Sequence, residues 1–80
     1  YIVSALRNVN TKRIALYLLE KPGAPQKEVS EKLQLDPSTV HWHAERLMNV
    51  GVLNSMREGR NVAYRINRPE VIYQILSFIP

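Results

Sequence analysis

The sequence predicts a mostly helical α+β fold in which three helices are followed by a β-hairpin and a C-terminal helix. Apolar residues recur at helical spacing in the first part of the chain, up to Gly51. The pattern then changes to strict alternation in "VAYRI", residues 62–66, which is the period of a half-buried strand. Because the chain has 80 residues, all of these elements are expected to form one domain.

The first two predicted helices are separated by the breaker "KPG", residues 21–23. Asn10 is expected to cap the first helix, because its side-chain oxygen can accept hydrogen bonds from the free N–H groups of the next turn. The apolar stripe of this helix is Ile14, Ala15, Leu18 and Leu19. Pro25 suits the start of the second helix because it lacks an N–H group, and Val29 and Leu33 supply the buried stripe.

The third predicted helix begins after a tight turn at Gln34 and Leu35 and ends at Gly51, a residue type that often stops helices. Asp36 is expected to cap this helix and Pro37 to take its first position. A carboxylate acceptor and a residue without an N–H group both suit a helix start. The expected buried stripe is Val40, Ala44 and Leu47.

The rest of the chain predicts a β-hairpin and a last helix. The second strand turns Val62, Tyr64 and Ile66 to one face, and residues 52–57 can pair with it. The Gly-containing segment "EGRN", residues 58–61, supplies the hairpin tip. The last helix begins at a proline, and its first and apolar residues are Pro69, Val71, Ile72, Ile75, Leu76 and Ile79.

Two short helices joined by a tight turn and followed by a basic hairpin make a winged helix-turn-helix. The helix pair is expected at residues 25–50, the wing at 52–67 and the C-terminal helix at 69–79. Residues 28–67 resemble the ArsR-type winged-helix repressors and related archaeal winged-helix regulators. The motifs that carry the resemblance are "STV", "NVGVL" and "REGR" followed by "YRI"; a departure is Gln34, where the family usually has Gly. The resemblance implies a transcription regulator that binds double-stranded DNA.

The third helix is expected to enter the major groove of DNA, because the second helix of such a pair reads base edges. The resemblance maps the contacts to its start and outward side, at Pro37, Ser38, Thr39, His41 and Trp42. Trp42 can contact a sugar, a thymine methyl group or a base step. It can also pack on the wing or a neighbouring helix, as large aromatic side chains usually do. His43 is about 200° around the axis from His41, so it is expected to be structural and the two cannot share a metal.

The wing is expected to supply most of the positive charge. The chain has eleven Lys and Arg residues against seven Asp and Glu residues, and four of the Arg residues fall between positions 57 and 68. The resemblance maps Arg57, Arg60 and Asn61 to the wing tip. The charge pattern adds Arg65 as a further phosphate contact.

Both ends of the chain are more apolar than a small core can use, which predicts a homodimer. The expected interface residues are Ile2, Leu6, Ile72, Ile75, Leu76 and Ile79. Either end can instead simply cap the core, or a neighbouring domain can cover it. The last alternative is open because the chain begins with Tyr1 rather than Met, so it is expected to be one domain of a longer protein.

The residue inventory argues against an enzyme, a cofactor or a metal site. The chain has no Gly-rich phosphate loop, no nucleophile beside a base, and no Cys. It has no signal peptide and no apolar run of the roughly 18–20 residues that span a bilayer, so no membrane contact and a cytoplasmic location are expected. The rival function is a winged-helix protein–protein interaction module that uses Trp42 and the apolar C-terminal helix.

Overall fold

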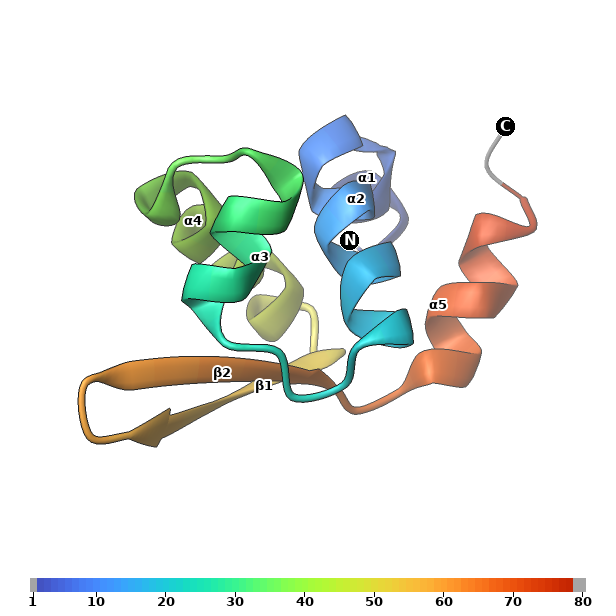
Figure 1. The fold of residues 1–80 in the computed structure, drawn as a ribbon. Coiled ribbons are helices and arrows are strands. Elements are labelled where there is room, and N and C mark those ends of the chain that lie inside the picture. Colours follow the sequence, from blue (N-terminus) through green and yellow to red (C-terminus); the bar gives the residue numbers. More distant parts are fainter. Residues whose placement is uncertain (1, 79–80) are drawn as a thin grey trace.

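The computed structural model describes residues 2–78 and confirms the predicted α+β class (Figure 1). Four helices precede an antiparallel hairpin, and a fifth helix follows it. The elements are α1 (Ile2–Arg7), α2 (Val9–Glu20), α3 (Gln26–Leu33), α4 (Pro37–Asn49), β1 (Leu53–Glu58), β2 (Asn61–Ile66) and α5 (Pro69–Leu76). The first of these helices, α1, is not among the elements that the sequence predicted. No helix in residues 2–78 is long and apolar enough to cross a membrane.

The cap of α2 is Asn8, so the prediction of Asn10 was wrong. The side-chain oxygen of Asn8 accepts hydrogen bonds from the backbone N–H groups of Asn10, at 3.0 Å, and Thr11, at 3.2 Å. Both asparagines offer the same cap chemistry, and the end of α1 at Arg7 decides between them. The unforeseen α1 therefore shifts the start of α2 toward the N-terminus.

The turn between α3 and α4 follows the predicted pattern. Gln34 has the left-handed conformation, with φ 55° and ψ 47°, and Leu35 donates its N–H to the Ser30 carbonyl at 3.0 Å. The Asp36 carboxylate caps α4 by accepting from the Ser38 N–H at 2.9 Å, and Pro37 is the first helical residue. Both predictions for the start of α4 are confirmed.

One core joins every element. It contains Leu6 from α1, Ile14 from α2, Val29 from α3, Val40 from α4, Leu53 from β1, Tyr64 from β2 and Ile72 from α5, all buried. The helices lie over one side of the hairpin, and the hairpin tip is at the end of the molecule where α4 begins, far from α5 (Figure 1).

The hairpin is fixed at its root and free at its tip. Leu53 pairs with Ile66 at the root and Glu58 with Asn61 at the tip, where Gly59 has φ +62°. A glycine with positive φ at the first turn position suits a two-residue hairpin loop. Near the root, the other edge of β2 is covered, because Tyr64 exchanges backbone hydrogen bonds of 3.0 Å with residues 23–24.

Candidate nucleic-acid interface

Helix α4 buries one face and exposes the other. Val40, His43, Ala44 and Leu47 are buried. Of the five residues predicted to contact DNA, Pro37, Ser38, His41 and Trp42 are exposed and Thr39 is half-buried. The buried stripe therefore holds the helix against the core. The predicted reading face stays exposed, so the helix can enter the major groove of a duplex.

The start of α4 is held by a compact set of hydrogen bonds. The Ser38 hydroxyl donates to Oδ1 of Asp36 at 2.6 Å, and the Ser38 N–H donates to the same oxygen at 2.9 Å. These bonds, the hydroxyl first, hold the pKa of the Asp36 carboxyl below its ordinary value. The Ser38 oxygen keeps acceptor capacity on the exposed surface, so it can still accept from a base amino group.

Trp42 lies in the open, so the alternative that it packs on the wing or a neighbouring helix is not seen. Its side chain is 54% exposed. The ring meets the His43 ring edge to face, with centroids 4.9 Å apart and an interplanar angle of 87°. The guanidinium carbon of Arg46 is 5.3 Å from the Trp42 ring centroid, which is a cation–π contact along the same helix.

The two histidines of α4 differ as expected. His41 is exposed, and its Nε2 lies 3.7 Å from Oε1 of Glu45, one turn further along. His43 is buried, and its Nδ1 is 2.8 Å from the Thr11 hydroxyl on α2. Burial first, and then the charge of Arg46, lowers the pKa of His43. The prediction that His43 is structural is confirmed.

No metal centre accompanies this face. Within residues 2–78, no group of three or more His, Asp and Glu side chains is arranged to hold an ion. The exposed start of α4 instead carries hydrogen-bonding side chains and one aromatic ring, which are groups that read base edges and methyl groups in a major groove.

The structure separates the predicted wing residues into two places. Arg57, Arg60, Asn61 and Arg65 are all exposed. Arg57 pairs with Val62 and therefore lies on the face of the ribbon that carries Tyr64, whereas Arg65 lies on the other face, because side chains alternate along a strand. Arg65 is also at the root, where it lines a hollow with Pro22, Pro69 and Tyr73. Arg57, Arg60 and Asn61 gather near the tip.

A hollow of about 400 Å³ lies between the starts of α3 and α4 and the wing. Lys27, Pro37, Arg60 and Asn61 are among the residues that line it. Two cationic side chains from elements far apart in the sequence thus border one depression together with the acidic Glu31. The depression keeps an excess of positive charge, which suits a phosphate group. From the sequence, Lys27 fits a DNA-backbone contact and a solvated helix position equally well, because its position on a helix start does not reveal that the wing lies opposite.

Gln26 connects the wing to α4. Its Oε1 accepts a hydrogen bond of 2.6 Å from the buried Tyr64 hydroxyl, and its Nε2 donates to the Pro37 carbonyl at 3.3 Å. The sequence gives no local signal for this link, because Gln26 and Tyr64 are 38 positions apart. The wing and the first residue of the reading helix are therefore held in one arrangement.

The predicted dimer residues do not form one exposed surface. Leu6 and Ile72 have no exposed area and belong to the core, so the prediction that they contact a second copy was wrong. Ile2, Ile75 and Leu76 are half-buried and packed against the core, and Ile79 lies outside the described residues. In a domain this small, these ends must first cover their own core, and only the remaining apolar area is free for a partner.

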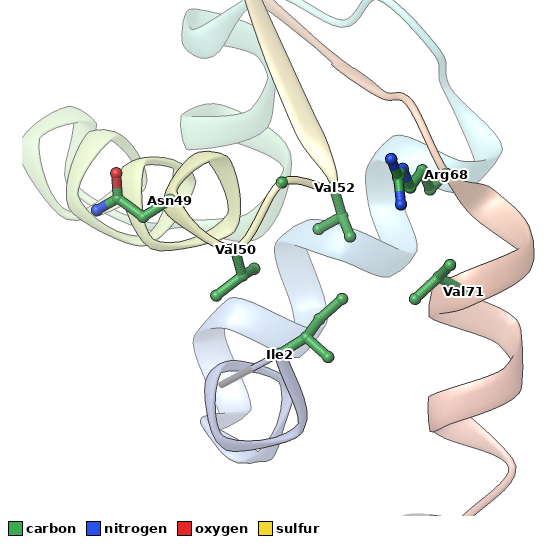
Figure 2. Close-up of a pocket in the computed structure, with 7 residues that line it drawn as sticks. Ile2, Asn49, Val50, Val52, Arg68 and Val71 are labelled. Carbon is green, nitrogen blue, oxygen red and sulfur yellow. The ribbon is translucent and has the colours of Figure 1, made fainter.

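A large hollow accompanies this apolar region (Figure 2). It measures about 750 Å³ and lies between α1, the end of α4 and α5. Ile2, Val50, Val52 and Val71 give it an apolar wall, and Arg68 lies at its edge near Val52 and Val71 (Figure 2).

Comparisons with known proteins agree on one family. Residues 7–54 match the winged helix-turn-helix DNA-binding family. Over 62 residues, the chain is 36% identical to an uncharacterized HTH-type transcriptional regulator, MJ1398, of Methanocaldococcus jannaschii. That alignment covers 78% of this chain but only 16% of the relative.

Solved structures share the fold, and one of them is a transcriptional regulator. HlyU from Vibrio cholerae, in its reduced form, superposes with a TM-score of 0.82 at 26% identity, over 96% of this chain and 80% of that one. The PcaV regulator from Streptomyces coelicolor, in complex with its natural ligand, gives a TM-score of 0.79 at 25% identity, over 89% of this chain and 53% of that one.

Proposed function

Since the chain belongs to the winged helix-turn-helix DNA-binding family, we propose that it is the DNA-binding domain of a transcription regulator. The observation that carries the proposal is the placement of two surfaces. The open polar face of α4 and the basic wing tip lie at one end of the molecule, and Gln26 joins the two elements. We further propose that the regulator is of the ArsR type, on the motifs of residues 28–67.

Helix α4 enters the major groove and supplies the reading contacts. The groove is about 12 Å wide and admits an α-helix. Ser38 and His41 carry hydrogen-bonding groups on the exposed face, whereas Pro37 and Thr39 place the first turn of α4 against the sugar–phosphate backbone of the DNA. Because this face carries few charges, α4 contributes the fit to the groove and the sequence preference, and it contributes less of the affinity for DNA.

The wing tip supplies the electrostatic attraction. Arg57, Arg60 and Asn61 face phosphates from the ribbon, and Lys27 adds a fourth contact from the far side of the hollow. If the three cations among them each neutralise one phosphate, the logarithm of the association constant should fall with the logarithm of salt concentration at a slope of about −2.7.

The test compares two arginines of the same hairpin. Labelled duplexes of mixed sequence are titrated with Arg60→Ala and Arg65→Ala proteins by fluorescence anisotropy at several salt concentrations. Arg60→Ala should weaken binding to every duplex and make the salt slope shallower by about 0.9, because one phosphate contact is lost. Arg65→Ala should change the slope little, because Arg65 lies at the root on the opposite face.

The opposite ranking of Arg60→Ala and Arg65→Ala would show that the other face of the ribbon meets DNA.

Ser38→Ala, in contrast, should change the preference among duplexes with little change in the salt slope, because it removes a base contact and no charge. If no duplex were bound in a salt-dependent way, the rival role would be favoured, in which the exposed Trp42 anchors a protein partner.

We propose in addition a cytoplasmic location and a homodimer whose two α4 helices meet successive turns of the duplex, about 34 Å apart. What is left of the apolar end surface, at Ile2, Ile75 and Leu76 beside the hollow of Figure 2, supports the dimer. Because the chain spans 16% of its curated relative, other domains of a longer protein are a competing cover for the same surface.

A further inference from the structure

Trp42 is the sole tryptophan of the sequence, and it lies on the face of α4 that we assign to DNA. Its 54% exposed side chain places a large apolar surface in water in the middle of a helix whose neighbouring positions are polar. A ligand that covers the ring removes this apolar area from water, which favours binding. The ring is therefore suited to bind an apolar group on the surface that α4 contacts.

The ring is held rather than free to swing. His43 supports it edge to face, and His43 is itself fixed by the hydrogen bond to Thr11. Arg46 lies over the ring at 5.3 Å from its centroid. Because one ring face is shared with a guanidinium group, the indole cannot slide between two base pairs, where both faces must stack on bases.

A major groove offers one apolar group to such a ring, and this is the 5-methyl group of thymine. We propose that Trp42 is a specificity residue of the proposed DNA-binding surface, and that its open indole face covers a thymine methyl group. Ser38 precedes Trp42 by one helical turn on the same face, and the side chain of His41 is next to it in the sequence. These two supply hydrogen bonds to neighbouring base edges, so the site selects a T·A pair flanked by polar contacts.

Arg46 is a positioning residue in this arrangement. Its guanidinium restrains the indole, and no acidic side chain within residues 2–78 forms an ion pair with it. Arg46→Met keeps the apolar stem of the side chain but removes the cation, so the Trp42 ring gains freedom. The variant should bind DNA and discriminate less between duplexes with and without the methyl group.

The experiment removes the methyl group and nothing else from the DNA. Affinities are measured by anisotropy for alternating A–T duplexes and for the same duplexes with uracil in place of thymine. A second pair compares alternating G–C duplexes with and without 5-methylcytosine, which places the same methyl group in a duplex of different shape. The wild-type protein should bind the methylated member of each pair about four-fold more tightly, the value expected for burying one methyl group.

Trp42→Ala should bind both members of each pair equally, whereas Trp42→Phe should keep part of the preference. Tyr73→Ala is the matched control, since Tyr73 is an exposed aromatic residue, at 59%, on α5 far from α4. It should leave the four-fold preference intact. Circular dichroism at the same temperature establishes that each variant is folded.

The outcomes separate this proposal from the function on which it rests. Salt-dependent binding with no preference for methylated duplexes, or an equal preference in Trp42→Ala, overturns the thymine contact and leaves the DNA-binding proposal standing. No binding to any duplex overturns both. The sole tryptophan adds a direct readout, because its emission should shift to shorter wavelength on binding thymine duplexes as water leaves the ring. Emission unchanged by a saturating duplex places Trp42 outside the contact and refutes the assignment.

Discussion

At the scale of single residues, His43 is the titratable group on which the packing of α4 depends. The ring is buried, its Nδ1 lies 2.8 Å from the Thr11 hydroxyl oxygen, and it meets the exposed Trp42 ring edge to face. A charge on this ring is disfavoured by burial and by Arg46, which together lower its pKa in the folded state. Protonation of His43 therefore acts against the fold on the helix that presents the proposed reading face.

The sign of the pH effect follows from this shift. In the unfolded chain, histidine titrates near its ordinary pKa of about 6.5, above the value in the folded state. Between the two values the unfolded chain binds more protons, so the free energy of unfolding should fall as the pH is lowered from about 7 through the folded pKa. Urea denaturation between pH 7.5 and 5 measures this dependence.

The matched variant is His43→Gln, which keeps a polar group near Thr11 but cannot titrate in this range. Its free energy of unfolding should change less between pH 7.5 and 5 than that of the wild type. His41→Gln is the control on the same helix, because it makes the same substitution at an exposed histidine. The nearest acidic group to His41, Oε1 of Glu45 at 3.7 Å, is also exposed to water. An equal pH dependence in the wild type and His43→Gln would remove His43 as the cause.

At the scale of elements, the α3–α4 turn depends on one residue with left-handed backbone dihedrals. Gln34 has φ 55° and is the one non-glycine residue with positive φ within residues 2–78. The Cβ atom makes this conformation unfavourable by roughly 1 kcal/mol, and glycine avoids that strain. The departure from the usual Gly at this position thus leaves strain in the turn that sets the angle between the two helices.

Gln34→Gly should raise the free energy of unfolding by about 1 kcal/mol, less the entropy that glycine adds to the unfolded chain. Gln34→Ala is the control, because it removes the side chain, keeps Cβ and should bring no such gain. Thermal and urea denaturation of the two variants measure the difference. Stabilisation by alanine as large as that by glycine would mean that the side chain, rather than the backbone, is the source of strain.

The sequence predicted those elements whose signals are local. Asp36 and Pro37 mark the start of α4 by their own chemistry, and the alternation around Tyr64 marks β2 and its inner face. The sequence did not predict the short α1, because an apolar start of the chain can also cover the core without forming a helix. Asn8 rather than Asn10 caps α2 because α1 ends at Arg7, and not because the two side chains differ in chemistry.

The interface was less predictable, because its geometry depends on contacts between distant segments. The face of Arg65 follows from the alternation along β2, but the face of Arg57 relative to it follows from the pairing register of the two strands, which no single strand reveals. The Gln26 link and the place of Lys27 depend on how the wing lies against α3. The open position of Trp42 depends on the angle between α4 and the wing, which is also a tertiary property.

At the scale of the whole molecule, the two apolar ends set the proposed oligomeric state. Ile75 on α5 is half-buried, so a charge placed there should disturb a partner surface more than the core. If the homodimer forms through this end, Ile75→Glu should raise the dimer dissociation constant by about ten-fold or more, measured by sedimentation equilibrium.

The control for the dimer is Met56→Glu, which places the same charge on an exposed apolar residue of the wing. It should leave the dissociation constant unchanged. A wild-type chain that stays monomeric at all concentrations would refute the dimer for this segment. That result would favour the alternative in which another domain covers the remaining apolar area.

The hydrogen-bonded chain from Tyr64 through Gln26 to Pro37 has a mechanical consequence. While both bonds hold, a tilt of the ribbon under a bent duplex pulls on the backbone at the first turn of α4; the exposed 3.3 Å bond to the Pro37 carbonyl is the weaker of the two. Bending of the duplex toward the ribbon and the fit of α4 in its groove are therefore not independent. Flexible operators and stiff ones should differ in affinity even where they present identical base edges.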